Sequence, residues 1–311
     1  MSDKEKIVIS SKEERSFDKQ IRPNLFTEFI GQKNLVNSLK TYILAAQERK
    51  EALDHILLYG PPGLGKTTLS NIIANELKKG FYSSSGPVIS IPGDLSGMLT
   101  NLQNRDVFFI DEIHRINTTV EEYLYSAMED YRIDILIDSG PNARTVRIDL
   151  EPFTLVGATT RLGKITTPMR DRFGAIFRLE YYKNDEIFQV LKRTSQILKV
   201  NIDEDAVHEI ALRSRGTPRV ANRILKRVRD FAQVQKSKKI TLSQASESLD
   251  SIGVDKNGLE EMDRKILNNL IFKFNGGPTG GKSLAISVNE DLQTIEDVYE
   301  PYLIKEGFIE R

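Results

Sequence analysis

The segment that most constrains the fold of this chain is residues 55–68, which read HILLYGPPGLGKTT. A short apolar run ends at Tyr59, the pattern G-x-x-x-x-G-K-[ST] follows from Gly60 to Thr67, and a helical pattern begins after it. A strand, a glycine-rich turn and a helix in this order form a loop that cradles phosphate groups. We therefore expect an α/β fold, with a nucleoside triphosphate as the ligand of this loop.

The residue types in the loop suit a phosphate ligand. Gly60, Gly63 and Gly65 can adopt backbone angles that other residues avoid, so that N–H groups of the loop and of the next helix can face phosphate oxygens. Lys66 would contact the β- and γ-phosphates, and the Thr67 hydroxyl would bind Mg²⁺. The alternative is an ordinary strand–turn–helix corner, which would not require the Lys and the Thr.

Composition excludes several classes of protein. The chain has 311 residues and no cysteine, which rules out disulfides, thiolate–zinc sites and cysteine nucleophiles. The N-terminus lacks the apolar core of a signal peptide, and no run approaches the ~20 apolar residues of a membrane span. None of the three histidines has metal-ligand spacing with another, and we interpret all three as structural. We expect a cytoplasmic protein that does not associate with a membrane.

Charge is balanced overall but unevenly distributed. The chain has 44 Lys or Arg and 44 Asp or Glu. Residues 213–239 contain ten basic side chains and one acidic side chain, whereas residues 257–311 contain six basic and ten acidic ones. A basic stretch of this kind indicates contact with nucleic acid or nucleotide, or a solvated helix face. Both interpretations stay open from the sequence.

Periodicity divides the chain into an α/β part and a helical part. Apolar runs at 56–59, 88–91, 107–110 and 153–156 alternate with helical stretches, which predicts a parallel sheet flanked by helices. Residues 184–250 show only helical patterns, broken near 200–203 and 216–218, and a turn at 256–258 opens a third, helical unit. The predicted domains are a polar arm (1–20), a large domain (21–183), a small helical domain (184–256) and a C-terminal domain (257–311).

A second element with phosphate chemistry is VFFIDE at residues 107–112. A buried strand that ends in two acids places them in the crevice where ligands bind to open α/β sheets. Asp111 would hold Mg²⁺, through water, and Glu112 would orient the attacking water as a base. Alone, such an ending could be a coincidental turn; after a phosphate-binding loop it indicates a nucleotide hydrolase.

Several further segments carry a family resemblance. The chain reads RPNLFTEFIGQ from Arg22, and then, in order, GPPGLGKTT, FIDEIHR, YSAMEDY, LVGATTR, PMRDRFG, RSRGTPR and VYEPYL. From about Arg22 to its last residue it resembles the AAA+ ATPases, and within them the bacterial motors that drive branch migration of Holliday junctions. The resemblance implies a large ATPase domain, a helical lid and a winged-helix domain. It also implies ATP and Mg²⁺ as cofactors, and a role in recombination, DNA repair and the SOS response to DNA damage.

The resemblance also implies roles for single residues. Thr160 matches a sensor near the γ-phosphate, Arg219 matches the second sensor, and Arg172 matches an arginine finger that acts on the ATP of a neighbouring subunit. Arg170 lies two residues away, so the choice of Arg172 depends on alignment alone. The remaining implied nucleotide contacts are Thr68 in the loop and Arg22, Glu129, Asp130, Tyr131 and Tyr182 around the adenine and ribose.

Residues 132–150 have a hairpin pattern, with apolar residues on each side of the turn signal SGPN at 139–142. An exposed apolar hairpin without a partner would promote aggregation. In the resembling motors such a hairpin docks on RuvA, the tetramer that grips the junction. The expected partner-contacting residues are Ile133, Ile135, Ile148 and Leu150.

Residues 276–283 also fit the phosphate-loop pattern, but no clear strand precedes them. We interpret them as a turn between helices of the winged-helix domain. The resemblance assigns a DNA contact to Arg311, and the rest of the usual wing is missing after it.

The resemblance implies a homohexameric ring on duplex DNA, with RuvA, the Holliday junction and, as a further partner, the resolvase RuvC. Two alternatives are a nucleotide-gated DNA-binding switch of the replication-initiator type and a clamp-loader-like ATPase.

Overall fold

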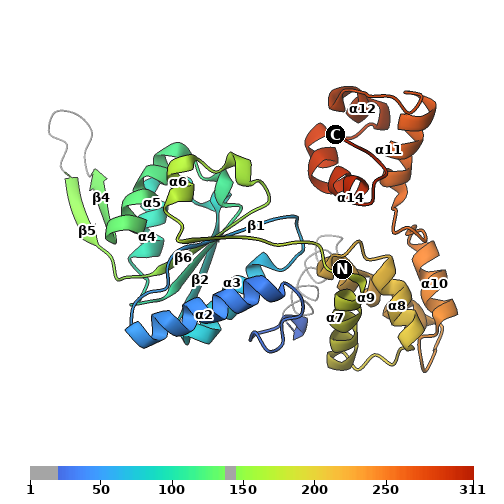
Figure 1. Ribbon diagram of the computed structural model, residues 1–311, viewed down its shortest axis with the longest axis horizontal. Coiled ribbons are helices and arrows are strands. Elements are labelled where there is room, and N and C mark those ends of the chain that lie inside the picture. Colours follow the sequence, from blue (N-terminus) through green and yellow to red (C-terminus); the bar gives the residue numbers. More distant parts are fainter. Residues whose placement is uncertain (1–19, 137–144) are drawn as a thin grey trace, which may run out of the picture. The chain divides into compact units, whose positions relative to one another are not determined.

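The structure is a computed structural model that describes residues 20–136 and 145–311. The chain divides into two compact units, Met1–Glu180 and Tyr181–Arg311 (Figure 1), and each is described by itself. The predicted arm, apart from residue 20, and the predicted hairpin turn at 139–142 lie outside the described residues. In the described part of the chain, no helix combines the length and the apolar character that crossing a membrane requires.

The first unit is built on a five-stranded sheet of order β2-β3-β6-β1-β7. Every neighbouring pair is parallel, so the predicted parallel sheet is confirmed. In register, Tyr59 lies opposite Thr159 and Ile110 lies opposite Gly157. The strands are β1 (Ile56–Tyr59), β2 (Phe81–Ser85), β3 (Val107–Asp111), β6 (Thr154–Thr159) and β7 (Ala175–Arg178).

The three central strands are the ones that the sequence predicted. Because β1, β3 and β6 are covered on both faces, they read as continuous apolar runs. The edge strands β2 and β7 were missed, since β2 is mostly polar and β7 alternates between partly buried and exposed residues. The predicted strand at 88–91 is wrong. That stretch connects the 3-10 turn Gly86–Val88 to a helix that begins at Pro92. Its residues Val88 and Ile91 are exposed.

Helices cover both faces of the sheet (Figure 1). On one face, α2 and α3 pack together, and α3 contacts the central strands. On the other face, α4 and α5 share a core cluster with Leu57 of β1, Phe108 of β3 and Leu155 of β6. The sheet is therefore a rigid layer between two helical layers. The helices are α2 (Lys33–Arg49), α3 (Lys66–Leu77), α4 (Pro92–Leu99), α5 (Thr118–Asp130) and α6 (Thr167–Asp171).

The predicted hairpin is present as a separate antiparallel pair, β4 (Arg132–Leu136) and β5 (Thr145–Asp149). Ile133 lies opposite Ile148 and Ile135 lies opposite Val146, so these four side chains share one face. Ile133 belongs to the core of the large domain, as does Leu150 after β5, whereas Ile135 and Ile148 are partly buried against that core and Val146 is exposed.

The second unit consists of helices, as predicted. The predicted breaks near 200–203 and 216–218 separate α7, α8 and α9, and the motif at 276–283 covers part of the turn after α11 and the first turn of α12. The basic stretch at 213–239 falls mainly on α9. The helices are α7 (Asn184–Ile197), α8 (Glu204–Leu212), α9 (Pro218–Val234), α10 (Leu242–Ser251), α11 (Glu261–Phe272), α12 (Gly281–Val288), α13 (Leu292–Thr294), the π-helical η4 (Ile295–Tyr299) and α14 (Glu300–Lys305).

His55, at the entry to β1, joins the sheet to α5. Its Nε2 donates to the carbonyl of Met128 at 3.0 Å, and its Nδ1 accepts the N–H of Leu155 at 2.9 Å. The imidazole is buried, and burial lowers its pKa from the usual 6.5. Only the neutral ring can make both hydrogen bonds, because a proton on Nδ1 would face another donor.

We expect stability to fall as the pH drops below about 6.5. In that range the unfolded chain binds a proton at His55 that the folded chain does not, so the free energy of unfolding should decrease by up to ~1.4 kcal/mol per pH unit. Urea unfolding at pH 7.5 and 5.5 measures this decrease. In His55→Gln it should become smaller; an equal pH dependence in both proteins would contradict this assignment.

Candidate active site

The functional side chains gather at one edge of the sheet. The phosphate loop follows β1, Asp111 ends β3 with Glu112 next to it, and Thr160 follows β6. Because β3, β6 and β1 are adjacent and parallel, their carboxyl ends meet at this edge. The register places Thr160 one residue beyond the Tyr59–Thr159 pair, so the phosphate loop, the two acids and Thr160 come together.

The loop backbone adopts angles that require glycine. Gly60, Gly63 and Gly65 have φ values of 140°, 81° and 101°. At Gly60 a Cβ atom would lie 2.5 Å from the carbonyl oxygen of Leu179, on the segment after β7. Gly60 also donates its N–H to Thr159 at 3.2 Å. The start of the loop is therefore held against β6 and the segment after β7, the two strands that flank β1, without any contact to a ligand.

Lys66 is the first residue of α3, and its side chain reaches back over the loop. Its buried ammonium donates to the carbonyls of Gly60 at 2.7 Å and Pro61 at 2.9 Å. Thr67 and Thr68 follow in the first turn of α3, where the N–H groups and the positive end of the helix dipole favour an anion. The cation and the helix start converge on the space that the loop encloses, which suits the phosphates of a nucleotide.

The donor set also fits a magnesium ion. Thr67 supplies a hydroxyl and Asp111 a carboxylate, the oxygen ligands that Mg²⁺ prefers. The described residues contain no cluster of three or more His, Cys, Asp or Glu that could hold a metal. In a P-loop site, phosphate oxygens and water complete the coordination.

Glu112 is held in an unusual backbone conformation. It has φ 49° and ψ 43° and begins a 3-10 turn, Ile113–Arg115, a left-handed conformation that is uncommon outside glycine. Its carboxylate lies 3.4 Å from Nε2 of His114, whose Nδ1 is 2.9 Å from the hydroxyl of Thr159. His114 therefore links the candidate base on β3 to the end of β6. The sequence interpretation missed this role, although His114 stands two residues after Glu112.

Arg172 follows α6 and contacts its own chain. One guanidinium nitrogen lies 3.1 Å from a carboxylate oxygen of Glu129, another donates to Pro168 at 2.8 Å, and the group stacks 4.3 Å from the ring centroid of Tyr125. Arg170 donates to Thr167 at 3.2 Å. The Nε atoms of both arginines are buried without a hydrogen-bond partner.

The helix that carries these arginines is anchored to α5. Glu121, which is buried, accepts hydrogen bonds from Tyr125 at 2.6 Å and from Thr166. Thr166 is the N-cap of α6 and accepts the N–H of Met169. Burial and the hydrogen bond to Glu121 raise the pKa of Tyr125, so it stays a neutral donor. The anchor fixes the start of α6, and with it the position of Arg172.

The remaining predicted nucleotide contacts are spread over both units. Asp130 pairs with Arg132 at 2.8 Å, and Tyr131 packs edge-on against Phe153. Glu129 and Asp130 form the end of α5 and Tyr131 follows them; of the three, Glu129 contacts Arg172. Arg22 is exposed near the start of the described residues of the first unit.

In the second unit, Tyr182 is buried and donates its N–H to Gly216 at 2.9 Å. Arg219 is exposed in the first turn of α9. Arg311 pairs with Glu296 at 2.6 Å and with Glu300 at 3.3 Å.

The sheet order, the glycine loop with its lysine, and the acids at the end of β3 define a P-loop ATPase of the AAA+ class. Models of three protein families match the chain. Residues 21–179 match the "Holliday junction DNA helicase RuvB P-loop domain", residues 182–255 the "RuvB AAA lid domain" and residues 256–311 the "RuvB C-terminal winged helix domain". The chain therefore belongs to the RuvB family.

Named relatives agree with this assignment. The Holliday junction branch migration complex subunit RuvB of Flavobacterium johnsoniae is 57% identical over 96% of this chain and 88% of its own length. The subunit of the same name from Myxococcus xanthus is 56% identical over 96% and 87%. The solved "Holliday junction branch migration motor" RuvB of Thermotoga maritima superimposes with a TM-score of 0.86, at 46% identity, over 94% of this chain and 93% of that one.

We expect His114→Ala to slow ATP turnover while leaving nucleotide affinity unchanged. The histidine lies against the candidate base and the hydroxyl of Thr159, so kcat should fall by about tenfold, part of the 10²–10⁴ that a positioned base contributes. Steady-state hydrolysis measures kcat, and fluorescence titration with a labelled nucleotide measures affinity. An unchanged kcat would reject this role.

Proposed function

We propose that this chain is an ATP-driven motor that moves Holliday junctions by branch migration. The observation that carries the proposal is the succession of three RuvB family matches, from residue 21 to residue 311, on a chain with a glycine-rich phosphate loop after β1 and two acids, Asp111 and Glu112, at the end of β3. An initiator-type switch and a clamp-loader-like ATPase are not favoured, because the three family models and the relatives reported above are described as RuvB.

In the proposed reaction, water attacks the γ-phosphorus of ATP, the bond to the β–γ bridging oxygen breaks, and ADP and phosphate leave. Glu112 orients the water and takes its proton. Lys66 donates to the β- and γ-phosphates in place of the loop carbonyls, and Thr160 hydrogen-bonds near the γ-phosphate. When bound at Thr67 and Asp111, Mg²⁺ would neutralise charge on the phosphate oxygens.

Arg172 would complete the site of a neighbouring subunit, which is why we propose a homohexameric ring. A guanidinium at the transferred phosphoryl group stabilises its developing negative charge. In the single chain Arg172 lies against Tyr125 and Glu129. These two residues would orient its guanidinium at the subunit surface before a neighbouring subunit binds. This gives Glu129 a role beside the arginine finger, in addition to the proposed contact with the nucleotide sugar.

Arg219 and Tyr182 would contact the nucleotide from the lid, with Arg22 from the large domain. Arg311 would contact duplex DNA by exchanging its two carboxylates for phosphates. RuvC is proposed as a further partner, and the cytoplasm, where bacterial DNA lies, as the location.

The β4–β5 hairpin is the proposed docking site for RuvA. The accessible part of its apolar face is Ile135, Val146 and Ile148, since Ile133 and Leu150 are already buried in the large domain. On the opposite face Arg147 pairs with Asp134 at 2.9 Å. One apolar and one charged face suit a hairpin that inserts one side into a partner.

A subunit-mixing experiment tests the finger in trans. Lys66→Ala removes the phosphate lysine and Arg172→Ala removes the finger, so each alone should lose activity, the latter by about 10³–10⁵ in rate. Mixed rings contain sites with the loop of one variant and the finger of the other, and steady-state ATP hydrolysis should partly return. Lys282→Ala, in the second motif, should hydrolyse ATP at the normal rate. No recovery in rings shown by mass photometry to be mixed would contradict the arrangement.

A junction assay tests the function and the docking face together. The chain should dissociate a synthetic four-way junction in the presence of RuvA, ATP and Mg²⁺, and much more slowly when any of the three is left out. Ile148→Asp should abolish the stimulation by RuvA without changing basal ATP turnover. Thr145→Asp, on the other face of the same strand, should retain it. Turnover of ATP without junction dissociation by the unmodified chain would favour one of the alternative functions.

A further inference from the structure

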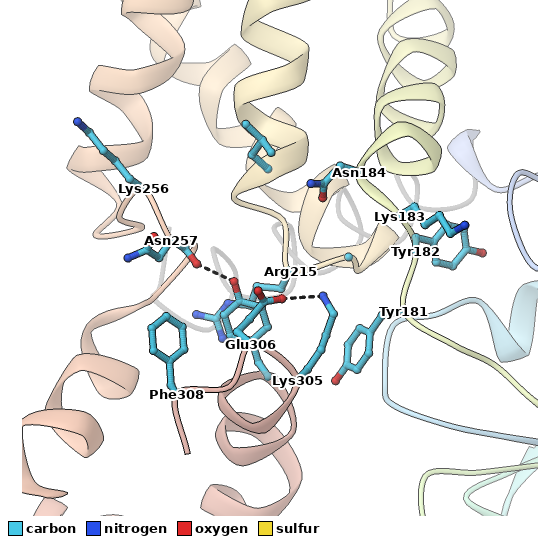
Figure 2. Close-up of a pocket in the computed structure, with 13 residues that line it drawn as sticks. Tyr181, Tyr182, Lys183, Asn184, Arg215, Lys256, Asn257, Lys305, Glu306 and Phe308 are labelled. Atoms are coloured by element: carbon cyan, nitrogen blue, oxygen red, sulfur yellow. Dashed lines mark hydrogen bonds and ion pairs between the residues drawn. The ribbon is translucent and has the colours of Figure 1, made fainter. Parts of the chain in front are cut away.

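The second unit consists of two halves that pack separately. Helices α7–α10 pack against one another, and α11–α14 surround their own core, which includes Leu259, Ile266 and Leu303. Between the halves lies a pocket of about 610 Å³, lined by residues of both (Figure 2). Side chains that bridge the halves beside this pocket connect the two cores.

Arg215 is a side chain that bridges the two halves. It comes from the loop between α8 and α9, donates to the carbonyl of Gly258 at 2.8 Å and pairs with Asp263 of α11 at 2.5 Å. Its guanidinium also lies 4.8 Å from the ring centroid of Tyr302 on α14. Figure 2 shows Arg215 among the side chains of Glu306 and Lys305 from the end of the chain. One residue of the lid thus contacts the linker, the first helix and the last helix of the winged-helix half.

This ion pair differs from the others at the junction in its burial. Arg215 is 9% exposed and Asp263 0%, whereas the Arg223–Glu260 pair nearby is 59% and 36% exposed. A buried pair does not exchange readily with water, and the loss of one partner leaves a buried charge uncompensated. The exposed pair contributes little.

The other end of the loop leads to the proposed nucleotide contacts. Arg215 and Gly216 have φ values of 57° and 64°, and a Cβ atom on Gly216 would lie 2.7 Å from the carbonyl oxygen of Tyr182. Gly216 accepts the N–H of Tyr182, and Thr217 begins α9, which carries Arg219. A movement of the loop with Tyr182 and Arg219 therefore also displaces Arg215.

We propose that Arg215 is a positioning residue that fixes the winged-helix half to the lid, so that a nucleotide-dependent movement of the lid is transmitted to the half that contacts DNA. The proposal rests on the proposed function as an ATP-driven branch-migration motor. It assigns Arg215 to coupling rather than to ATP hydrolysis. We call its contacts with Gly258, Asp263 and Tyr302 the Arg215 bridge, and we expect junction movement to be lost and ATP hydrolysis to be kept when this bridge is removed.

The test compares Arg215→Met with Arg223→Met, the matched change at the exposed pair. Arg215→Met should hydrolyse ATP within twofold of the unmodified chain but dissociate four-way junctions, with RuvA, at least tenfold more slowly. Arg223→Met should retain both activities. Arg215→Lys keeps a charge for Asp263 but has a single nitrogen in place of the guanidinium fork. Its rate of junction dissociation should lie between those of Arg215→Met and the unmodified chain. A parallel loss of ATP hydrolysis in Arg215→Met, or junction dissociation at the normal rate, would overturn the proposal.

A distance measurement tests the bridge without any activity. Because the chain has no cysteine, spin labels can be placed at Gln233→Cys on α9 and Ser283→Cys on α12, both exposed. The distance distribution should broaden in Arg215→Met and stay narrow in Arg223→Met. An equally narrow distribution in both would refute the bridge, whether or not the chain moves junctions. If the unmodified chain does not move junctions, the proposed function is wrong. The distance measurement still shows whether Arg215 holds the two halves together.

Discussion

Parallel hydrogen bonding of β6 to its two neighbours, β1 and β3, determines where the phosphate loop, the two acids and Thr160 lie. The register Tyr59–Thr159 and Ile110–Gly157 aligns three strand ends at one edge. The loop with Lys66 follows one strand, Asp111 and Glu112 end the second, and Thr160 follows the third. A shift of one residue in either pairing would move a carboxylate or a hydroxyl by more than 3 Å, which is more than a hydrogen bond tolerates.

The central strands could be predicted from sequence because burial on both faces demands uninterrupted apolar residues. Ile56–Tyr59 and the runs at 107–110 and 153–156 satisfy that demand, and all three are strands. The edge strands β2 and β7 could not be found in this way, since one side of an edge strand faces solvent and its residues need not be apolar. The segment at 88–91 was wrongly predicted to be a strand for the opposite reason. It is apolar, although Val88 and Ile91 are exposed.

The site residues divide along similar lines. The phosphate loop and the acids after β3 have local patterns whose spacing follows from the chemistry, so the sequence predicted where they meet. The contacts of His114 with Glu112 and Thr159, of Arg172 with Tyr125 and Glu129, and of Arg215 with Asp263 join segments that are distant in sequence or depend on backbone geometry. No pattern in a single sequence specifies such contacts.

The two edge strands have a consequence for assembly. An open sheet exposes unpaired backbone groups at both ends, where another chain can add a strand. Here β7 has four residues and ends at an arginine, and β2 is largely polar. Short or polar edges are poor templates for continuous β-structure. Subunits crowded around a common axis would therefore recognise one another through side-chain shape and charge, which can be released and remade with each turnover, rather than through a backbone ladder that would lock them together.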